Sequence, residues 1–368
     1  MPITVAALRE TAAGERRVAI TPETAKKFNA RGLRVLLERG AGSAAGFPDA
    51  DYAGVEWGED AAAVARAADV LLCVLPPADA ALAHLRAGSV LAGQLRPYGA
   101  SARLQAIAAR GATAFALERL PRSTRAQAMD TLSSQAAVAG YRAALLAAEA
   151  APRFFPMLTT AAGTIRPSRV LVIGAGVAGL QAIATARRLG AQVEGFDVRP
   201  ETREQVQSLG AKFLELGVSA SGSGGYAREL TAEERARQQQ ALSEHLRGID
   251  VLITTAAVPG RQAPHIVSAA MVAGMKPGAV IVDVAAESGG NCEPTRPGER
   301  IEHGAVTILG PLNLAAGHPL HASEMIARNF AHFLDLLVGR DGALAMDFGD
   351  ELVSASCVVR EGTVTFGE

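Results

Sequence analysis

The sequence predicts an α/β protein of two Rossmann-like domains with mostly parallel sheets, a cleft between the domains and two long helices that link them. Three observations support this. The chain has 368 residues, more than one hydrophobic core usually serves. Short apolar runs of strand length alternate with helix-length stretches in both halves. A Gly-rich turn, GAGVAG (174–179), directly follows one of these runs.

The first third of the chain carries five strand signals with helix-length stretches between them. Thr21 and Pro22 are typical of the N-cap and first position of a helix. Strands alternating with helices favour a parallel sheet covered on both faces. The expected strands are ITVAAL (3–8), LRVLLE (33–38), AADVLLCVLP (67–76), GSVLAG (88–93) and GATAFAL (111–117).

Two long helices mark the domain boundaries. The Ala-rich stretch 133–150 predicts the first, and a second α/β unit starts near Arg169. The stretch 319–338 predicts the other, followed by a tail too short to form a domain by itself. We therefore expect the tail to return to the first domain. The predicted domains are residues 1–132 plus 318–368, and the NAD-binding Rossmann domain, residues 133–317.

Composition excludes several function classes. The formal net charge is −1, without the basic excess of a nucleic-acid-binding protein. The seven His have no metal-ligand spacing, so we expect no metal site. Three Cys without a CxxC pair fit free thiols in a reducing compartment. There is no signal-peptide pattern and no apolar run near the ~20 residues of a membrane helix, so we expect a cytoplasmic protein.

The glycine turn predicts a dinucleotide site. In this pattern Gly174 permits the tight turn, Gly176 lets the pyrophosphate approach the backbone, and Gly179 lets helix and strand pack closely. Asp197 ends the next strand, near the ~20-residue offset of a ribose-binding acid. Such an acid repels a 2′-phosphate and favours NAD(H), although Arg199 keeps NADP(H) open as an alternative. The other interpretation is a Gly-rich turn without a ligand.

Two later strand ends should face the same crevice, because ligands bind outside the carboxyl ends of parallel strands. They are Thr254 to Ala257 and Asp283 to Ala286. The Gly-rich stretch GSGGY (222–226) carries Tyr226, which can close over a cofactor as a lid. A plain flexible connection is the alternative.

The expected site lacks a general base. A dehydrogenase that oxidises an alcohol or amine needs a positioned His or Lys. The first domain offers Leu75 and Arg96 at its strand ends, and the His residues fall on predicted helices or surface segments. Hydride transfer from one nicotinamide ring to another needs no base, only positioning and exclusion of water. The chain has no second GxGxxG, so the second nucleotide would come on another polypeptide.

The stretch LPRSTRAQAMDTLSSQ (120–135) gathers many polar side chains in one place. It completes a resemblance that covers nearly the whole chain. The sequence resembles the soluble NAD(H)-binding component, domain I, of proton-translocating nicotinamide nucleotide transhydrogenase. Besides GAGVAG, the segments that carry the resemblance are RRVAITPETAKKF (16–28), ALERLPRSTRAQAMDTLSSQAAVAGYRA (116–143), RPETREQVQSLGAKFLEL (199–216), ITTAAVPGRQAP (253–264) and VIVDVAAESGGNCE (280–293).

The resemblance implies roles for individual residues. The stretch 120–135 matches an Arg-Gln-Asp loop that folds over the nicotinamide and its ribose, with an Asp130–Arg122 pair to fix it; a solvated helix cap is the alternative. The predicted catalytic and positioning residues are Arg122, Gln127, Asp130 and Ser133. The remaining predicted cofactor-binding residues are Gly174, Ala175, Gly176, Val177, Gly179, Asp197, Val198, Arg199, Gly225, Tyr226, Thr255, Ala256 and Ala257.

The resemblance also implies partners. The component dimerises through its NAD-binding domain, NADP(H) is bound on a separate domain III, and a membrane domain II couples the exchange to proton movement. The chain would then be cytoplasmic and peripheral to the inner membrane. The segment 310–325 departs from the family pattern. Two alternatives stay open: an alanine dehydrogenase-like enzyme, which shares RVAITP, and a non-catalytic NAD-binding regulatory subunit.

Overall fold

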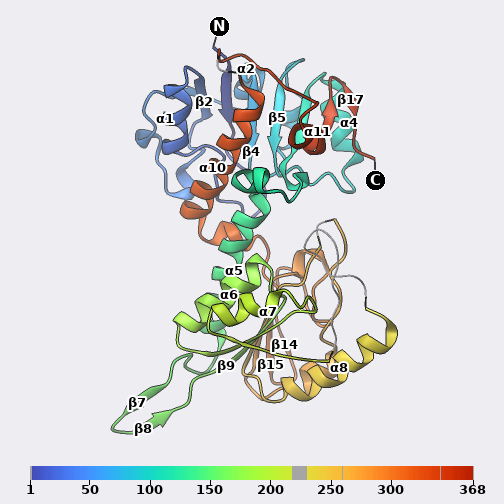
Figure 1. Cartoon of the computed structure of the whole chain (residues 1–368). Coiled ribbons are helices and arrows are strands. Elements are labelled where there is room, and N and C mark those ends of the chain that lie inside the picture. Colours follow the sequence, from blue (N-terminus) through green and yellow to red (C-terminus); the bar gives the residue numbers. More distant parts are fainter. Residues whose placement is uncertain (1, 218–229, 259, 340, 368) are drawn as a thin grey trace. The chain divides into compact units, whose positions relative to one another are not determined.

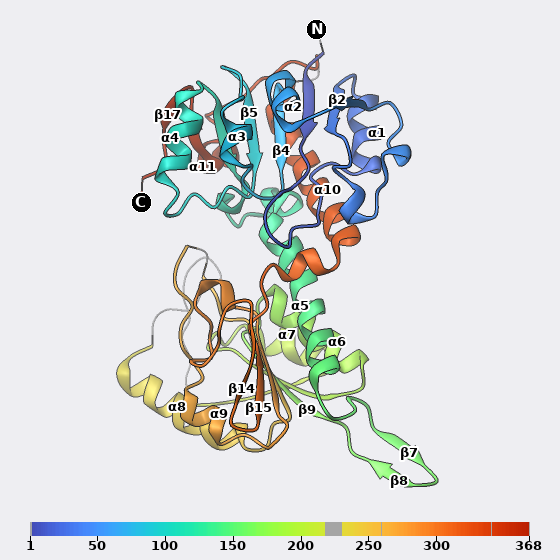
Figure 2. The same cartoon turned by 180° about the vertical axis from the view of Figure 1, so that it is seen from behind.

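The computed structural model describes residues 2–217, 230–258, 260–339 and 341–367. It divides into two compact units: unit 1 is Met1–Gln135 with Ala316–Glu368, and unit 2 is Ala136–Ala315. The boundaries predicted after residues 132 and 317 lie close to these. Each unit is built on one mainly parallel sheet with helices on both faces, which confirms the predicted fold class (Figures 1 and 2).

Unit 1 contains an eight-stranded sheet in the order β17-β16-β6-β5-β4-β1-β2-β3. The strands β1 to β6 run parallel, while β16 is antiparallel to β6 and β17 antiparallel to β16. The C-terminal tail therefore completes the sheet of the first unit. The strands are β1 Thr4–Ala7, β2 Arg34–Glu38, β3 Glu56–Gly58, β4 Val70–Cys73, β5 Val90–Gly93, β6 Thr113–Ala116, β16 Cys357–Arg360 and β17 Thr363–Val364.

Both faces of this sheet are buried, so its strands have apolar residues at successive positions. In β4, Val70 and Leu72 pack into one core with α1 and α10, while Leu71 packs into the other with α2 and α4. The N-cap Thr21 accepts from Thr24 N at the start of α1, as predicted. The helices of unit 1 are α1 Pro22–Ala30, α2 Ala61–Ala67, α3 Asp79–Leu82, α4 Ser101–Ala109, α10 Pro319–Leu337 and α11 Glu351–Ser356.

Unit 2 contains a seven-stranded sheet in the order β11-β10-β9-β12-β13-β15-β14, in which only β14 is antiparallel to its neighbour. From β9, the order of the parallel strands is that of a dinucleotide-binding fold. The strands are β9 Arg169–Ile173, β10 Gln192–Phe196, β11 Lys212–Phe213, β12 Val251–Thr254, β13 Val280–Asp283, β14 Arg300–His303 and β15 Val306–Leu309.

The unit 2 sheet is also covered on both faces. Val170 and Val172 of β9 pack with α5 and α6, and Leu171 packs with α8 and α9. A Cβ on Gly140 of α5 would lie 2.0 Å from the carbonyl oxygen of Ala178 on α6, so these helices cross with their backbones in contact. The helices are α5 Thr131–Ala150, which begins in unit 1, α6 Val177–Arg188, α7 Thr202–Ser208, α8 Ala232–Leu246 and α9 Ala269–Ala273.

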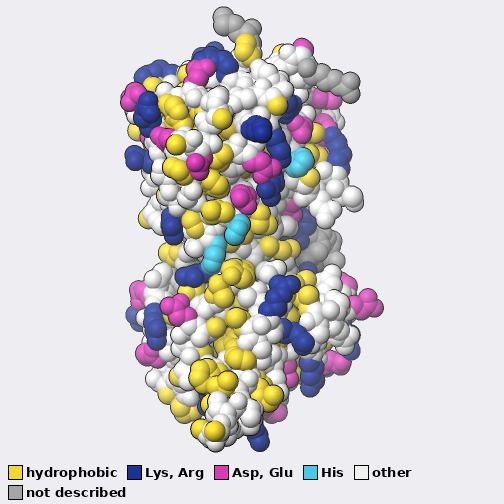
Figure 3. Space-filling model, turned by 90° about the vertical axis from the view of Figure 1, so that its left-hand side faces the viewer, with side chains coloured by type: hydrophobic (Ala, Val, Ile, Leu, Met, Phe, Trp, Pro, Cys, Tyr) yellow, Lys and Arg dark blue, Asp and Glu magenta, His cyan; other side chains and the backbone are white. Residues whose placement is uncertain are grey.

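A β-hairpin that the sequence analysis did not predict extends from unit 2 (Figures 1 and 2). Its strands, β7 (Leu158–Thr160) and β8 (Gly163–Ile165), pair only with each other and are exposed at every residue. Hydrophobic side chains gather on this end of unit 2 in Figure 3, and Phe154, Met157, Leu158 and Ile165 are exposed there. No helix among the described residues is long and apolar enough to cross a membrane.

Candidate functional site

The turn between β9 and α6 contains three glycines, each with its own surroundings. Gly174 has a φ of +93°, and a Cβ there would lie 2.6 Å from Oγ1 of Thr255. A Cβ on Gly179 would lie 1.7 Å from the carbonyl oxygen of Gly174, so α6 approaches β9 this closely only with glycine at that position. A Cβ on Gly176 would meet nothing within 4 Å. The space beside Gly176 therefore admits a ligand.

The N-terminus of α6 opens onto the same space. Gly176 is the N-cap, and it provides no side-chain hydrogen bond to the first turn of the helix. The first backbone N–H groups of a helix lack partners within the helix and favour anions. Val177 at the first helical position is exposed, while Ala175 is buried. These residues fit the pyrophosphate of a dinucleotide.

Asp197 follows β10 and is bonded to the glycine turn. Its Oδ2 accepts from Ala175 N at 2.8 Å and from Nη2 of Arg199 at 2.7 Å. Its Oδ1 accepts from Arg199 N and Nε, both at 2.9 Å. A carboxylate has about four lone-pair sites. These four donors are enough to occupy it, so Arg199 lies where the sequence analysis expected a ribose.

The end of β12 completes this edge of unit 2. Thr255 N donates to Ile173 O at 2.8 Å, and Thr255 Oγ1 donates to Gly174 O at 3.0 Å. Ala257 is exposed, and Ala256 is half-buried. Unit 2 thus brings together at the carboxyl ends of β9, β10 and β12 the predicted residues Gly174, Ala175, Gly176, Val177, Gly179, Asp197, Val198, Arg199, Thr255, Ala256 and Ala257. Gly225 and Tyr226, with the predicted lid, lie outside the described residues.

The Arg-Gln-Asp segment belongs to unit 1 and forms the short 3₁₀ helix η4 (Thr124–Met129). Ala126 and Met129 are buried in the unit 1 core, and Nδ2 of Asn329 on α10 donates to Ala128 O at 2.8 Å. Gln127 and Arg122 are exposed. The core thus fixes the backbone of this segment while those two side chains stay accessible to a ligand.

Asp130 acts as a helix cap at the start of α5. Its Oδ1 accepts from Ser133 N at 2.9 Å, and its Oδ2 accepts from Ser133 Oγ at 2.5 Å. The structure therefore brings Asp130 and Ser133 together, and the predicted pair of Asp130 with Arg122 stays a prediction. Since the Arg-Gln-Asp segment lies in unit 1 and the glycine turn in unit 2, their joint use in one site also stays a prediction.

Two carboxylates at the strand ends of unit 1 were missed by the sequence analysis. Glu10, after β1, accepts from Val74 N at 2.6 Å and Leu75 N at 3.2 Å, beyond the end of β4. Glu118, after β6, accepts from Leu95 N at 3.2 Å and from Arg96 N, beyond the end of β5. The search for a base considered only β4 and β5 and only His or Lys. The position of Glu10, two residues after ITVAAL, was the available signal.

Burial changes the protonation of both groups. It raises the pKa of Glu10 to about 7, with a smaller contribution from the charge of Glu15, while the N–H donors of Val74 and Leu75 act in the opposite direction. Burial also raises the pKa of Glu118. A carboxyl that titrates near neutrality has the acid strength of a general base. Both carboxylates, however, already accept two backbone hydrogen bonds.

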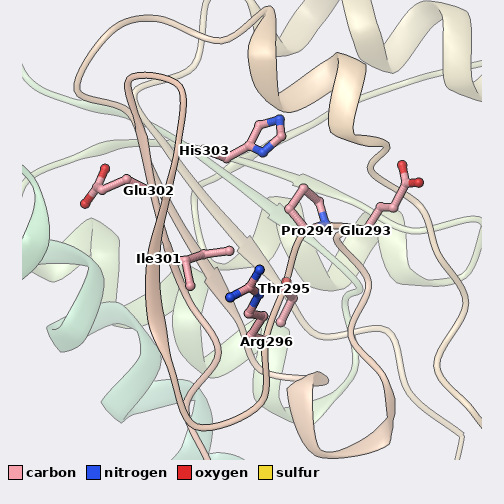
Figure 4. Close-up of a pocket in the computed structure, with 7 residues that line it drawn as sticks. All are labelled: Glu293, Pro294, Thr295, Arg296, Ile301, Glu302 and His303. Carbon is pink, nitrogen blue, oxygen red and sulfur yellow. The ribbon is translucent and has the colours of Figure 1, made fainter.

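A surface pocket of about 420 Å³ lies elsewhere in unit 2, beside β14 (Figure 4). Glu293 and Glu302 place two carboxylates around it, against Arg296 and His303. None of the predicted site residues lines this pocket, and its mixed charge does not suit a dinucleotide phosphate. The glycine turn remains the better candidate.

Comparison with known families follows the two halves of the chain. A profile of the alanine dehydrogenase/PNT N-terminal domain matches residues 6–139, and one of the alanine dehydrogenase/PNT C-terminal domain matches residues 143–367. The chain belongs to the alanine dehydrogenase/PNT family. Both branches named in this family are among its relatives.

The transhydrogenase branch is the more similar. A relative from Rhodospirillum rubrum, named as an NAD(P) transhydrogenase subunit alpha, is 43% identical over 372 residues, which cover 98% of this chain and 97% of that protein. The protein of the same name from Rickettsia prowazekii is 40% identical over 98% of this chain and 95% of that protein. Alanine dehydrogenase of Mycobacterium tuberculosis is 34% identical, over 78% of this chain and 74% of that protein. The predicted resemblance is confirmed.

Solved structures agree. The crystal structure of transhydrogenase from Sinorhizobium meliloti has a TM-score of 0.87 at 42% identity and covers 98% of both chains. An L-alanine dehydrogenase structure has a TM-score of 0.82 at 23% identity, covering 99% of this chain and 97% of that one, and it shows the fold alone.

Glu10 leads to a pH-dependent prediction. Its pKa is higher in the folded chain than the usual 4.5, so the folded state holds the proton more tightly. Its contribution to stability is therefore lost as pH rises from about 4.5 to about 7, by at most about 3 kcal/mol. We expect Glu10→Gln to reduce the fall in unfolding free energy of unit 1 between pH 5 and pH 8.

Fluorescence of Trp57, the only Trp of the chain, follows urea unfolding of unit 1. Glu149→Gln, at an exposed position of α5, serves as the control and should keep the parent's pH dependence. An identical pH dependence in Glu10→Gln and the parent would contradict the assignment.

Proposed function

We propose that the chain is the NAD(H)-binding component of a nicotinamide nucleotide transhydrogenase. It holds NADH for hydride transfer to NADP⁺ on a partner domain III, and a separate membrane domain II couples the transfer to proton translocation. The chain is then cytoplasmic and peripheral to the inner membrane through these partners. The observation that carries the proposal is the glycine turn bonded to Asp197 through Ala175 N–H, in a chain whose relatives are named transhydrogenase subunits.

Unit 2 supplies the binding groups in this proposal. The backbone N–H groups of Gly176 and Val177 bind the pyrophosphate at the N-terminus of α6. Asp197 accepts from the adenosine ribose, whose hydroxyls displace the donors of Arg199. Thr255 and the residues after it line the cofactor. A carboxylate at this position repels a 2′-phosphate, which supports NAD(H) over NADP(H).

Unit 1 supplies the orienting groups. Gln127 and Arg122 are exposed on a segment whose backbone is fixed by Ala126 and Met129, so they can hold a ring or ribose without moving the fold. When bound, NADH supplies the hydride. The side chains position the ring and exclude water, and none of them takes a proton. Asp130 and Ser133, which bond to each other, hold the end of the segment.

A second candidate function has one specific observation in its favour. Glu10, with a pKa near 7, is a possible base for an alanine dehydrogenase-like reaction. Its bonds to Val74 N and Leu75 N argue against this, because a base must be accessible to its substrate. A non-catalytic NAD-binding subunit is a third possibility.

Two assays separate these functions. The purified chain is tested for NADH production from L-alanine and NAD⁺. It is then mixed with an NADP(H)-loaded transhydrogenase domain III and tested for hydride transfer from NADH. We expect transfer in the mixture and none with L-alanine. Alanine turnover would refute the proposal, and NADH binding without transfer to a competent partner would favour the regulatory subunit.

The β7–β8 hairpin supports a homodimer through unit 2. A two-stranded hairpin is marginally stable in water, and this one also exposes Met157 and Ile165. Contact with a second copy buries that apolar surface. It is consistent with the family's dimerisation through the NAD-binding domain.

Two charges on the hairpin should therefore abolish the dimer. We expect light scattering to give twice the chain mass for the parent and a single chain mass for Met157→Glu with Ile165→Glu. Leu320→Glu, at an exposed apolar position in unit 1, is the control and should remain dimeric. A monomeric parent, or a dimeric double variant, would rule out this interface.

Asp197 should contribute to NADH affinity. We expect Asp197→Ala to weaken NADH binding by more than tenfold, about 1.4 kcal/mol, as measured by titration of NADH fluorescence. The matched control is Asp250→Asn. Asp250 is also buried and accepts from Arg169 N, at the opposite end of β9, so its change should leave the affinity intact. Equal affinity in Asp197→Ala and the parent would remove its assigned role.

Gln127 should act on transfer more than on binding. We expect Gln127→Ala to slow hydride transfer to partner-bound NADP⁺ at saturating NADH by tenfold or more, while NADH affinity falls less than threefold. Arg125→Ala on the same 3₁₀ helix is the control, since Arg125 is paired with Asp350. Parent-like transfer rates in Gln127→Ala would count against the orienting role.

A further inference from the structure

Asn291 makes an unusual set of contacts behind the candidate cofactor site. It is fully buried, and its Oδ1 accepts from Ala256 N at 2.9 Å. Its Nδ2 donates to Ala256 O at 2.7 Å and to Pro264 O at 2.9 Å. One amide side chain therefore pairs with both backbone groups of Ala256, as a neighbouring strand would. It also joins the two ends of the segment 256–264.

Asp283 fixes Asn291 in turn. It is fully buried, and its Oδ2 accepts from Asn291 N at 2.8 Å, Cys292 N at 3.0 Å and Thr295 Oγ1 at 2.7 Å. Its Oδ1 accepts from Thr254 Oγ1 at 3.0 Å and Ala285 N at 3.1 Å. All five donors are uncharged. A buried carboxylate with neutral partners needs these bonds, so it orders the segment that carries Asn291.

These contacts lead to the glycine turn. Thr255, next to Ala256, donates through Oγ1 to Gly174 O. A shift of Ala256 would therefore move the residue that packs against Gly174, and would move Ala257 with it. The hydrogen bonds run from Asp283 through Asn291 to Ala256, and the chain then continues to Thr255 and the turn.

We propose that Asn291 is a positioning residue of the NAD(H) site, with Asp283 as its anchor. This inference rests on the proposed function. Asn291 holds Ala256 in place before the cofactor arrives, so binding does not have to order the segment 256–264. Ordering several residues costs free energy that subtracts from affinity. Loss of the Asn291 amide transfers that cost to the binding step.

The test compares Asn291→Ala and Asn291→Asp with Thr295→Val. Aspartate keeps the Oδ1 acceptor and the size of Asn291 but loses both donated bonds. Thr295→Val removes one donor from the same buried network without touching the segment 256–264, so it controls for general destabilisation. NADH affinity is measured by fluorescence, at a temperature where circular dichroism shows every variant folded. Hydrogen exchange of peptides covering 256–264 is measured with and without NADH.

We expect both Asn291 variants to weaken NADH binding about tenfold and Thr295→Val to change it less than twofold. Exchange in 256–264 should be faster in the free Asn291 variants and slow again with NADH. Parent-like affinity in the Asn291 variants, or equal weakening by Thr295→Val, would overturn the inference. If the parent itself does not bind NADH, the proposed function fails. Exchange still tests the contact then, because parent-like exchange in both Asn291 variants would refute it.

Discussion

The unit 2 site depends on how closely α6 approaches the end of β9. Gly179 allows the helix to contact the carbonyl of Gly174, and Gly174 leaves room for Oγ1 of Thr255. This approach sets where the N-terminus of α6 lies relative to Asp197, because Ala175 between them donates to that carboxylate. A larger residue at either glycine would separate the anion-binding end of the helix from the acid that follows the next strand.

Carboxylates at the strand ends follow a common arrangement in the two units. Glu10 and Glu118 each accept from two backbone N–H groups beyond a neighbouring strand, and Asp283 accepts from three others. Parallel strands leave such groups at their carboxyl edge, and a buried N–H without a partner is costly. These acids are therefore part of the frame of the sheet edge. That role agrees with a reaction in which the protein positions a ring and exchanges no proton with it.

The sequence predicted what depends on local pattern. Apolar runs gave the strands, and the spacing of Gly174, Gly176 and Gly179 gave the turn. The β7–β8 hairpin was missed because its residues are exposed and lack the buried pattern of a strand. Asn291 lay in a segment quoted for the family resemblance, but its contact with Ala256, 35 positions away, depends on the fold. Side chains that bond to distant backbone leave no periodic signal.

Cofactor choice in unit 2 depends on a pair of residues. Asp197 alone suggests NAD(H), but Arg199 occupies its oxygens with three of the four donors. A ribose that bonds to Asp197 must compete with the Arg199 side chain for the same oxygens. Preference for NAD(H) thus reflects how strongly Asp197 retains its charge-assisted partner as well as its own repulsion of a phosphate. The acid and the base act as one specificity element, with the glycine turn as the third member through Ala175 N–H.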